Sequence, residues 1–231
     1  MLYFLIGYIG QVPTEVFIVM LLAYFLAICI SLTSHEFAHS FTAVKCGDLT
    51  PKLTGRLTLN PFAHFSGLGF LMLVLVGFGW AKPVSINPAN FRNYKKGMIW
   101  VSVSGVLTNL VLAFVFSGLS FLTLNLAGHL FLEGNIFIIF LAYFFDFSVT
   151  LNLVFCIFNL LPLYPLDGFN LLSTFLKYDN KFVQFMYKYG FIILLILILP
   201  LIGGQSILSY FYDYVIGGIY SLFNAFWGLF V

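Results

Sequence analysis

The segment His35-Glu36-Phe37-Ala38-His39 places two histidines and a glutamate at a spacing that suits metal chemistry. In a helix, His35 and His39 lie about one turn apart on the same face, so both imidazoles can bind one metal ion. Glu36 is then placed to act as general base on a water molecule that the metal activates. The pattern predicts a Zn²⁺ cofactor with His35 and His39 as metal ligands and Glu36 as the catalytic residue.

A catalytic zinc ion usually has three protein ligands and one open position. The other acids within or near apolar segments are Asp146, Asp167 and Asp213. Asp167 follows Pro162 and Pro165, which interrupt a helix and allow a side chain to point into a cavity at membrane depth. We therefore expect Asp167 to be the third metal ligand. Asp146 lies in the middle of an apolar run, and we expect it to be a packing or helix-pairing residue.

The composition around these residues is that of a membrane protein. Hydrophobic residues make up 61% of the 231 residues, charged residues only 8%, and the mean hydropathy is +1.05. Roughly a quarter of the residues in a soluble domain are charged. The core of a bilayer contains no water, so the backbone must satisfy its hydrogen bonds internally, which favours helices.

Several apolar runs are long enough to cross a hydrocarbon core of ~30 Å. They cover residues 16–45, 97–127, 135–163, 186–202 and 206–228. A further run, 65–80, would reach only ~24 Å as a straight helix and is rich in glycine. We interpret it as a re-entrant hairpin, with a short extra crossing as the alternative.

The fold prediction is an all-α polytopic membrane protein with about five transmembrane helices plus a re-entrant glycine-rich hairpin. It forms a single membrane-embedded domain over residues 1–231. The catalytic core is expected at about 16–180, and the C-terminal helices at 186–228.

The placement of charge and of the expected ligands favours the hairpin. If 65–80 does not cross, all ten lysines and arginines lie on one side of the membrane, which is then cytoplasmic. His39 and Asp167 precede Lys45 and Lys177 by six and ten residues, so both lie within ~15 Å of that side. For the ligands to meet, 16–45 and 135–163 must run in the same direction. One crossing, 97–127, then separates them, and 65–80 must return to its own side.

With these motifs in place, the chain resembles the site-2 proteases, the family of intramembrane zinc metalloproteases, and especially their compact bacterial branch without appended domains. The segments that carry the resemblance are HEFAH at 35–39, GRLTLNPFAHFSGLG at 55–69, GWAKPVSINPANFRN at 79–93 and NLLPLYPLDG at 159–168. Ser66 departs from the family pattern, which usually has aspartate there. Val106 departs from it too, because relatives have an Ala-Gly-Pro sequence where this chain has Ser104-Gly105-Val106.

The resemblance implies an enzyme that hydrolyses peptide bonds within or near the transmembrane segments of membrane proteins, in regulated intramembrane proteolysis. It implies His35, His39 and Asp167 as metal ligands, Glu36 as catalytic base, and Asn159 as a substrate-binding group near the scissile carbonyl. The implied partners are transmembrane protein substrates and the lipid bilayer, with no nucleic acid. The implied location is the cell membrane, as a multi-pass protein with its active site toward the cytoplasmic side.

Two further polar residues, His64 and Asn109, lie in or near the apolar segments. His64 could be a second metal ligand or a substrate contact, but we interpret it as a surface histidine near the headgroups. We interpret Asn109 as structural.

A metal or proton transporter would use embedded histidines and acids as a relay, but no repeat of spans is visible. A two-iron oxidase would need more than four histidines. A catalytically silent relative would be expected to lack one of the chemical positions.

Overall fold

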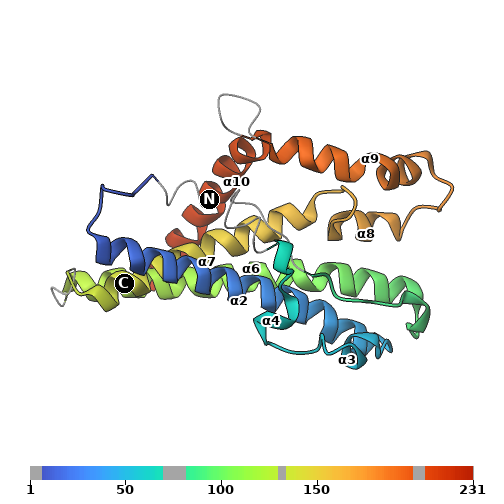
Figure 1. Cartoon of the computed structure of the whole chain (residues 1–231), viewed down its shortest axis with the longest axis horizontal. Helices are drawn as coiled ribbons and strands as arrows, with labels where there is room; N and C mark the ends of the chain where they lie inside the picture. The colour runs from blue at the N-terminus through green and yellow to red at the C-terminus, as the bar shows by residue number, and fades with distance from the viewer. Residues whose placement is uncertain (1–6, 70–81, 130–133, 200–205, 231) are drawn as a thin grey trace.

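The computed structural model of the chain describes residues 7–69, 82–129, 134–199 and 206–230 (Figure 1). Within these ranges the chain is helical and contains no β-strand. The helices with the length and composition to cross a membrane are α2 (Thr14–Cys46), α6 (Tyr94–His129), α7 (Ile136–Leu160) and α9 (Lys181–Ile198). The prediction of an all-α polytopic membrane protein is confirmed. A fifth span remains a prediction, carried by α10 (Ile207–Trp227), in which the side chain of Asp213 lies outside the described residues.

Short elements connect these helices. They are α3 (Thr50–Leu53), α4 (Pro61–His64), η1 (Pro88–Asn90) and α8 (Asp167–Ser173), with η2 (Gly228–Phe230) following α10. Local sequence sets several boundaries. α2 ends at Gly47, whose φ of 114° suits glycine, and its N–H satisfies carbonyls of the last turn. α7 begins after Asn135, whose side chain accepts hydrogen bonds from the first free N–H groups.

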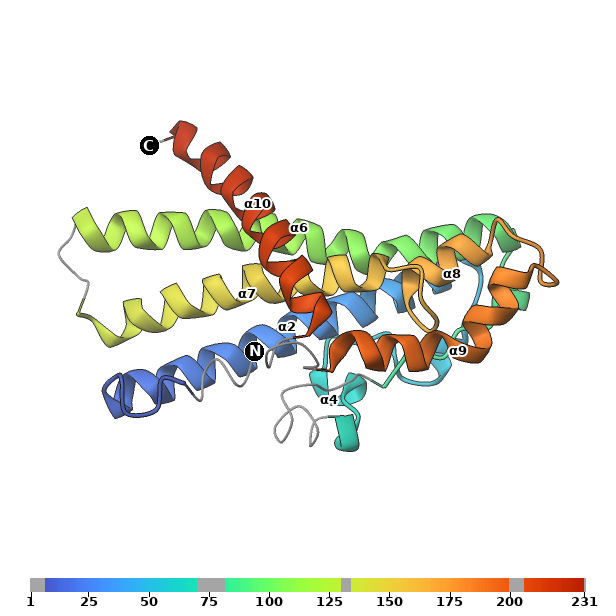
Figure 2. The ribbon, with the colours of Figure 1, turned by 90° about the horizontal axis from the view of Figure 1, so that it is seen from above.

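Helices α2, α6 and α7 form the core of the molecule. α2 and α7 run in the same direction and α6 runs against them, as the expected ligand geometry requires (Figure 2). Between α2 and α7, small and aromatic side chains interlock, among them Ala23, Ala27, Phe144 and Phe147. Small residues allow helix backbones in a membrane to approach closely. The three-helix core therefore places α2, which carries the two histidines, directly beside the helix that leads to Asp167.

The connection between α2 and α6 leaves and returns at the same end of the bundle. The N–H of Arg92 donates to the carbonyl of Cys46 at 2.9 Å, so the start and the end of the connection meet. The N–H of Lys82 donates to the carbonyl of His64 at 2.7 Å, so the residues that flank 65–81 are neighbours. A segment whose ends meet is what the re-entrant interpretation requires. Residues 70–81 lie outside the described residues, and the hairpin stays a prediction.

Asp48 fastens this connection with a fully buried carboxylate. Oδ1 accepts hydrogen bonds from the hydroxyl and N–H of Thr50 and from the side chain of Asn90, and Oδ2 accepts one from the N–H of Asn87 at 2.7 Å. Burial raises the pKa of Asp48, but the hydrogen bonds to the carboxylate outweigh burial, and the pKa lies below its ordinary value. The carboxylate therefore ties the end of α2 to η1.

We expect Asp48→Asn to lower the free energy of unfolding near neutral pH by about 2 kcal/mol, because hydrogen bonds to an ionised acceptor are lost. A carboxyl group whose pKa is lowered by folding stabilises the protein at pH values above its pKa in the unfolded chain. This stabilisation is lost as the pH falls through the pKa of the group in the folded protein. The difference between wild type and variant should therefore shrink below about pH 4. Thermal unfolding in detergent at a series of pH values measures it. Asp179→Asn, at an exposed acid, is the control, and a gap independent of pH would contradict the assignment.

Candidate active site

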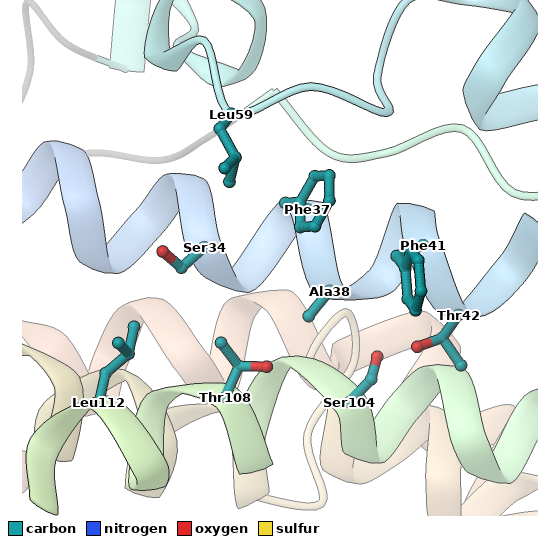
Figure 3. A pocket seen from close by; sticks show the side chains of 9 residues that line it. All are labelled: Ser34, Phe37, Ala38, Phe41, Thr42, Leu59, Ser104, Thr108 and Leu112. Carbon is teal, nitrogen blue, oxygen red and sulfur yellow. The ribbon is translucent and has the colours of Figure 1, made fainter. Parts of the chain in front are cut away.

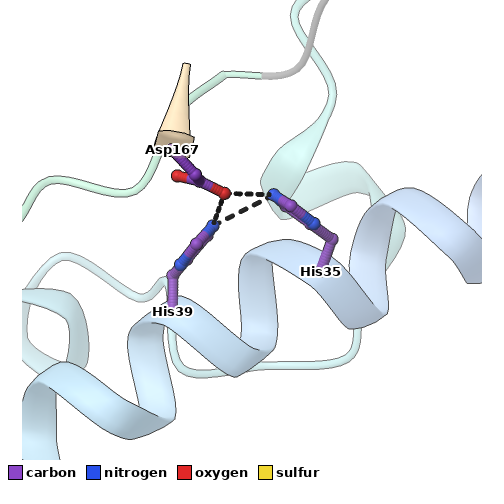
Figure 4. Close-up of side chains that lie close together, drawn as sticks. All are labelled: His35, His39 and Asp167. Atoms are coloured by element: carbon purple, nitrogen blue, oxygen red, sulfur yellow. Dashed lines mark hydrogen bonds and ion pairs between the residues drawn. The ribbon is translucent and has the colours of Figure 1, made fainter. Parts of the chain in front are cut away.

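The three residues expected to bind zinc converge in the structure. His35 and His39 are both 6% exposed, on one face of α2, and their Nε2 atoms are 3.0 Å apart. Asp167 Oδ2 lies 3.3 Å from Nε2 of His35 and 3.1 Å from Nε2 of His39 (Figure 4). Among the described residues, these three make up the group of histidines, cysteines and acids whose ligand atoms lie close enough to hold one metal ion.

The other nitrogen of each imidazole faces an oxygen that can only accept a hydrogen bond. His35 Nδ1 lies 2.6 Å from Asn109 Oδ1, and His39 Nδ1 lies 2.8 Å from the carbonyl oxygen of Val101. Both Nδ1 atoms must therefore carry the proton and donate it. Each Nε2 then presents a lone pair toward the other histidine and toward Asp167, which is the usual arrangement of metal-binding histidines.

This donor set fits a zinc ion. Two Nε2 lone pairs and a carboxylate oxygen within 3.3 Å of one another repel unless a cation lies among them. Asp167 Oδ2 is buried and receives no hydrogen bond, as expected of an atom whose partner is a metal. Ligand atoms at 2.0–2.2 Å around tetrahedral Zn²⁺ are separated by about 3.3 Å, close to the distances observed.

The break after α7 brings Asp167 to the histidines. α7 ends at Leu160, two residues before Pro162, and α8 begins at Asp167 itself. Gly168 packs against the carbonyl groups of Leu160 and Leu161 so closely that a Cβ at this position would clash with backbone atoms. Glycine at 168 thus permits the tight return of the chain, and the return places the preceding carboxylate over α2.

Comparison with known proteins now identifies the family. Over 180 residues the sequence is 38% identical to the Bacillus subtilis (strain 168) protein named "Putative zinc metalloprotease YwhC", an alignment that covers 77% of this chain and 80% of that protein. Residues 125–197, which include Asp167, match peptidase family M50. The chain belongs to peptidase family M50, the site-2 proteases. A second relative, "Putative zinc metalloprotease Rip2" of Mycolicibacterium smegmatis, is 30% identical over 200 residues, 84% of this chain and 70% of its own. No solved structure matches the chain.

The protein is therefore a membrane zinc metalloprotease with several apolar helices and Zn²⁺ as its cofactor. The expected compact organisation agrees with relatives of which this chain covers most of the length.

A buried polar network holds His35 in its tautomer, and sequence reasoning recognised only part of it. Asn152 donates to the carbonyl of Ser148 at 2.8 Å, which orients its amide so that Oδ1 accepts from Asn109 Nδ2 at 2.7 Å. The oxygen of Asn109 is thereby turned toward His35. Both asparagines are fully buried, and Asn152 also donates to the hydroxyl of Ser31. Asn152 and Ser31 were missed, although polar residues inside apolar runs are the signal that could have found them.

Gly105 leaves the space that the imidazoles occupy. A Cβ at this position of α6 would lie 2.6 Å from Cε1 of His35 and 2.6 Å from Nε2 of His39. No real Cβ packs so closely, so a side chain here would push the rings away from Asp167. A small residue at this position thus allows α6 to pack closely against the histidines of α2.

Gly105→Ala is expected to lower zinc affinity by roughly 10- to 100-fold, the range found when groups that orient metal ligands are changed. Titration of the metal-free protein with zinc in the presence of a competing chelator measures the effect. Gly128→Ala is the matched control on the same helix, because a Cβ there would meet no atom within 4 Å. Equal zinc affinity of Gly105→Ala and wild type would show that the imidazoles do not need this space.

Glu36 lies beside the histidine pair at the surface of α2, partly buried. Its Oε2 accepts a hydrogen bond from the N–H of Val84 at 3.3 Å. Val84 lies two residues after Lys82, whose N–H donates to the carbonyl of His64 at the base of 65–81. The glutamate is thus held by the chain segment that closes the connection between α2 and α6.

The remaining expected residues lie elsewhere. Asn159 donates to the carbonyl of Phe155 one turn back in α7 and makes no hydrogen bond to the three ligands. His64 is fully buried, and its Nε2 bonds to the carbonyl of Thr58 at 2.8 Å. The interpretation of His64 as a surface histidine is wrong, because the segment that carries it folds against α2. Asp146 is not among the ligands and bonds to Tyr220 of α10, as expected of a helix-pairing residue.

A groove of about 380 Å³ runs along the seam between α2 and α6 (Figure 3). Its walls include Ser34 and Ala38 of α2 and Ser104 of α6, whose hydroxyl lies 3.4 Å from Nδ1 of His39. Ser34 and Ala38 each lie about 160° around the helix from Glu36. The groove therefore flanks the histidine pair on the side of α2 opposite the glutamate.

Proposed function

We propose that this protease hydrolyses peptide bonds within or near the transmembrane segments of other membrane proteins, in regulated intramembrane proteolysis. The observation that carries the proposal is the depth of the converging ligands in an apolar helix. His35 and His39 precede the end of α2 at Cys46 by eleven and seven residues, which places them about 17 and 11 Å inside the helix end. A substrate peptide bond that reaches these residues must itself enter the bilayer.

In this proposal, His35, His39 and Asp167 would hold Zn²⁺, and the bound metal would supply an activated water molecule and a positive charge beside the substrate carbonyl. Glu36 accepts a proton from the water and delivers it to the leaving amine. The Val84 N–H orients the Glu36 carboxylate through Oε2. Asn159, at the end of α7, donates its amide to the substrate carbonyl in place of its present bond to Phe155.

The substrate segment must unwind before it is cut. In a transmembrane helix each carbonyl is hydrogen-bonded within the helix, so attack requires a locally extended chain. We propose that this extended stretch pairs with the edge of the glycine-rich 65–80 hairpin. The support is the glycine content of the run and the contact that joins its flanks at His64 and Lys82.

The experiment that tests the function is cleavage in a defined membrane. The purified protein is reconstituted in liposomes with a tagged single-span membrane protein, and the products are mapped by mass spectrometry. We expect cleavage within or near the span, its loss with a zinc chelator, and its return with added zinc. Chelator-insensitive cleavage would contradict the proposal. Transport of zinc into the liposomes without any cleavage would favour the transporter alternative.

We also propose that the protein lies in the cell membrane with its active site toward the cytoplasm. α2 ends and α6 and α9 begin at the same end of the bundle, and most lysines lie in or next to these ends (Figure 2). Positive charge near helix ends favours the cytoplasmic side.

Single cysteines at Thr54 and Asn90 test this orientation, in a background in which Cys29, Cys46 and Cys156 are replaced. Both are expected to react with an impermeant thiol reagent in inverted vesicles and not in intact cells, because the bond between Arg92 and Cys46 holds both ends of the connection together. Labelling of the two positions from opposite faces would show that 65–80 crosses the membrane.

A further inference from the structure

Asp146 is an acid near the middle of the membrane that the zinc site does not use. It follows Ile136, the first residue of α7, by ten positions and precedes Leu160, the last, by fourteen. It therefore lies about 15 and 21 Å from the two helix ends, near the centre of a ~30 Å hydrocarbon core. The side chain is exposed. An exposed carboxyl group at this depth is costly and calls for a partner.

Within the molecule, one of the two carboxylate oxygens of Asp146 receives a hydrogen bond. The hydroxyl of Tyr220 donates to Oδ1 of Asp146 at 2.9 Å. Oδ2 has no hydrogen-bond partner among the described residues. Beside the carboxylate is a cavity of about 200 Å³, lined by Ser120 and Leu124 of α6 and by Ala142, Tyr143 and Asp146 of α7. An acceptor oxygen, two hydroxyl-bearing residues and open space thus occur together between α6 and α7.

The depth of the cavity limits what can fill it. Lipid tails carry no hydrogen-bond donor, so a donor at the bilayer centre must come from another transmembrane helix. A second copy of this chain in the same orientation does not supply a cation there. Its basic residues lie near the C-terminal end of α7, beside the end of α2 and the starts of α6 and α9, and not at the depth of Asp146. Lys188, the deepest of them in a described helix, is only about 10 Å inside α9.

We propose that the cavity beside Asp146 is a docking site for a transmembrane helix of another membrane protein that carries a lysine or arginine near the bilayer centre. The basic side chain enters between α6 and α7 and donates to Oδ2 of Asp146. The site lies about 21 Å along α7 from Leu160, whose carbonyl packs against Gly168 beside the zinc ligand Asp167. Docking is therefore remote from hydrolysis and does not depend on it.

Photocrosslinking in liposomes tests the site with synthetic transmembrane peptides. The full-length, zinc-loaded protein carries a photoreactive residue at Leu124, in the wall of the cavity. The probes are a leucine-rich peptide with one lysine at its centre, the same peptide with the lysine near one end, and an all-leucine peptide. We expect the central lysine to raise crosslinking about fivefold over the other two, in line with the strength of polar contacts between membrane helices.

Variants separate docking from support of α10. Asp146→Leu is expected to abolish the preference for the central lysine, and Tyr220→Phe, which removes the internal partner and leaves the acid, is expected to keep it. If Asp146→Leu does not fold, Asp146→Asn preserves the size of the side chain and should still reduce the preference severalfold. Equal crosslinking of all three peptides to wild type, or an unchanged preference in Asp146→Asn, would overturn the proposal. Loss of the preference in Tyr220→Phe would overturn it too, because the acid would then serve only to hold α10.

Discussion

The Glu36→Gln protein is expected to bind zinc as wild type does and to lose cleavage by about 10³-fold, the size of effect that removal of a general base produces. The amide has the size of the carboxylate, so the local packing of α2 is preserved. Glutamine cannot take up a proton from water near neutral pH. The separation of binding from turnover is possible because Glu36 is not among the residues whose ligand atoms converge.

Two measurements on the same preparation check this result: zinc content by elemental analysis, and cleavage of a reconstituted membrane substrate. Glu15→Gln is the matched control, since Glu15 lies in the first turn of the same helix, far from the histidines, and should leave both quantities unchanged. Wild-type turnover by Glu36→Gln would remove the glutamate from the mechanism. Loss of zinc would instead make it a ligand or a structural neighbour of one.

The long helices were predictable because the membrane leaves few alternatives. The apolar runs 16–45, 97–127 and 135–163 correspond to α2, α6 and α7 within a few residues. α9 begins at Lys181, before the run that starts at 186, because its first turns are amphipathic and extend the helix beyond the apolar stretch. Hydropathy detects the part of a helix that lipid requires, whereas capping by Asn180 sets where the helix begins.

The convergence of His35, His39 and Asp167 was predictable because it rests on local rules. Helical periodicity places His35 and His39 on one face, and the prolines before Asp167 interrupt the helix that would carry it away. The Val101 carbonyl, the Val84 N–H and the contact of Asn152 with Asn109 were not predictable in this way, although the position of Asn152 inside an apolar run signals a polar role. They reach the site through the packing of α6, α7 and the returning connection against α2, and no spacing in the sequence encodes that contact.

The same limit explains His64. Its position in a polar segment between spans suggested an exposed side chain, but Lys82 bonds to its backbone, and Arg56, itself buried, bonds to the carbonyl of Ala63 beside it. A polar connection in a membrane protein can fold back over its helices, and burial then depends on contacts between residues distant in the chain.

Asp167→Asn is expected to release zinc. The substitution preserves the shape of the side chain and removes its charge, leaving two neutral imidazoles and a neutral amide to hold a divalent cation. Oδ2 of Asp167 is buried and has no hydrogen-bond donor, so it is the position where a negative charge would balance a bound metal ion. We expect zinc affinity to fall by more than the roughly 100-fold that loss of an outer partner of a ligand costs. His35→Ala and His39→Ala should behave alike, because each removes one corner of the same triangle of ligand atoms.

Asp146→Asn is the matched control for Asp167→Asn, because it makes the same chemical change in an acid that the described contacts join to Tyr220. Its zinc content should equal that of wild type, measured by competition with a chromogenic chelator after the metal-free proteins are titrated with zinc. The comparison distinguishes loss of a ligand from loss of a carboxylate that merely supports the fold. If Asp167→Asn retained zinc while Asp146→Asn lost it, the third ligand would have been misassigned. The return after α7, for which Pro162 and Gly168 provide the break and the close approach, would then need a purpose other than delivering a carboxylate to the histidine pair.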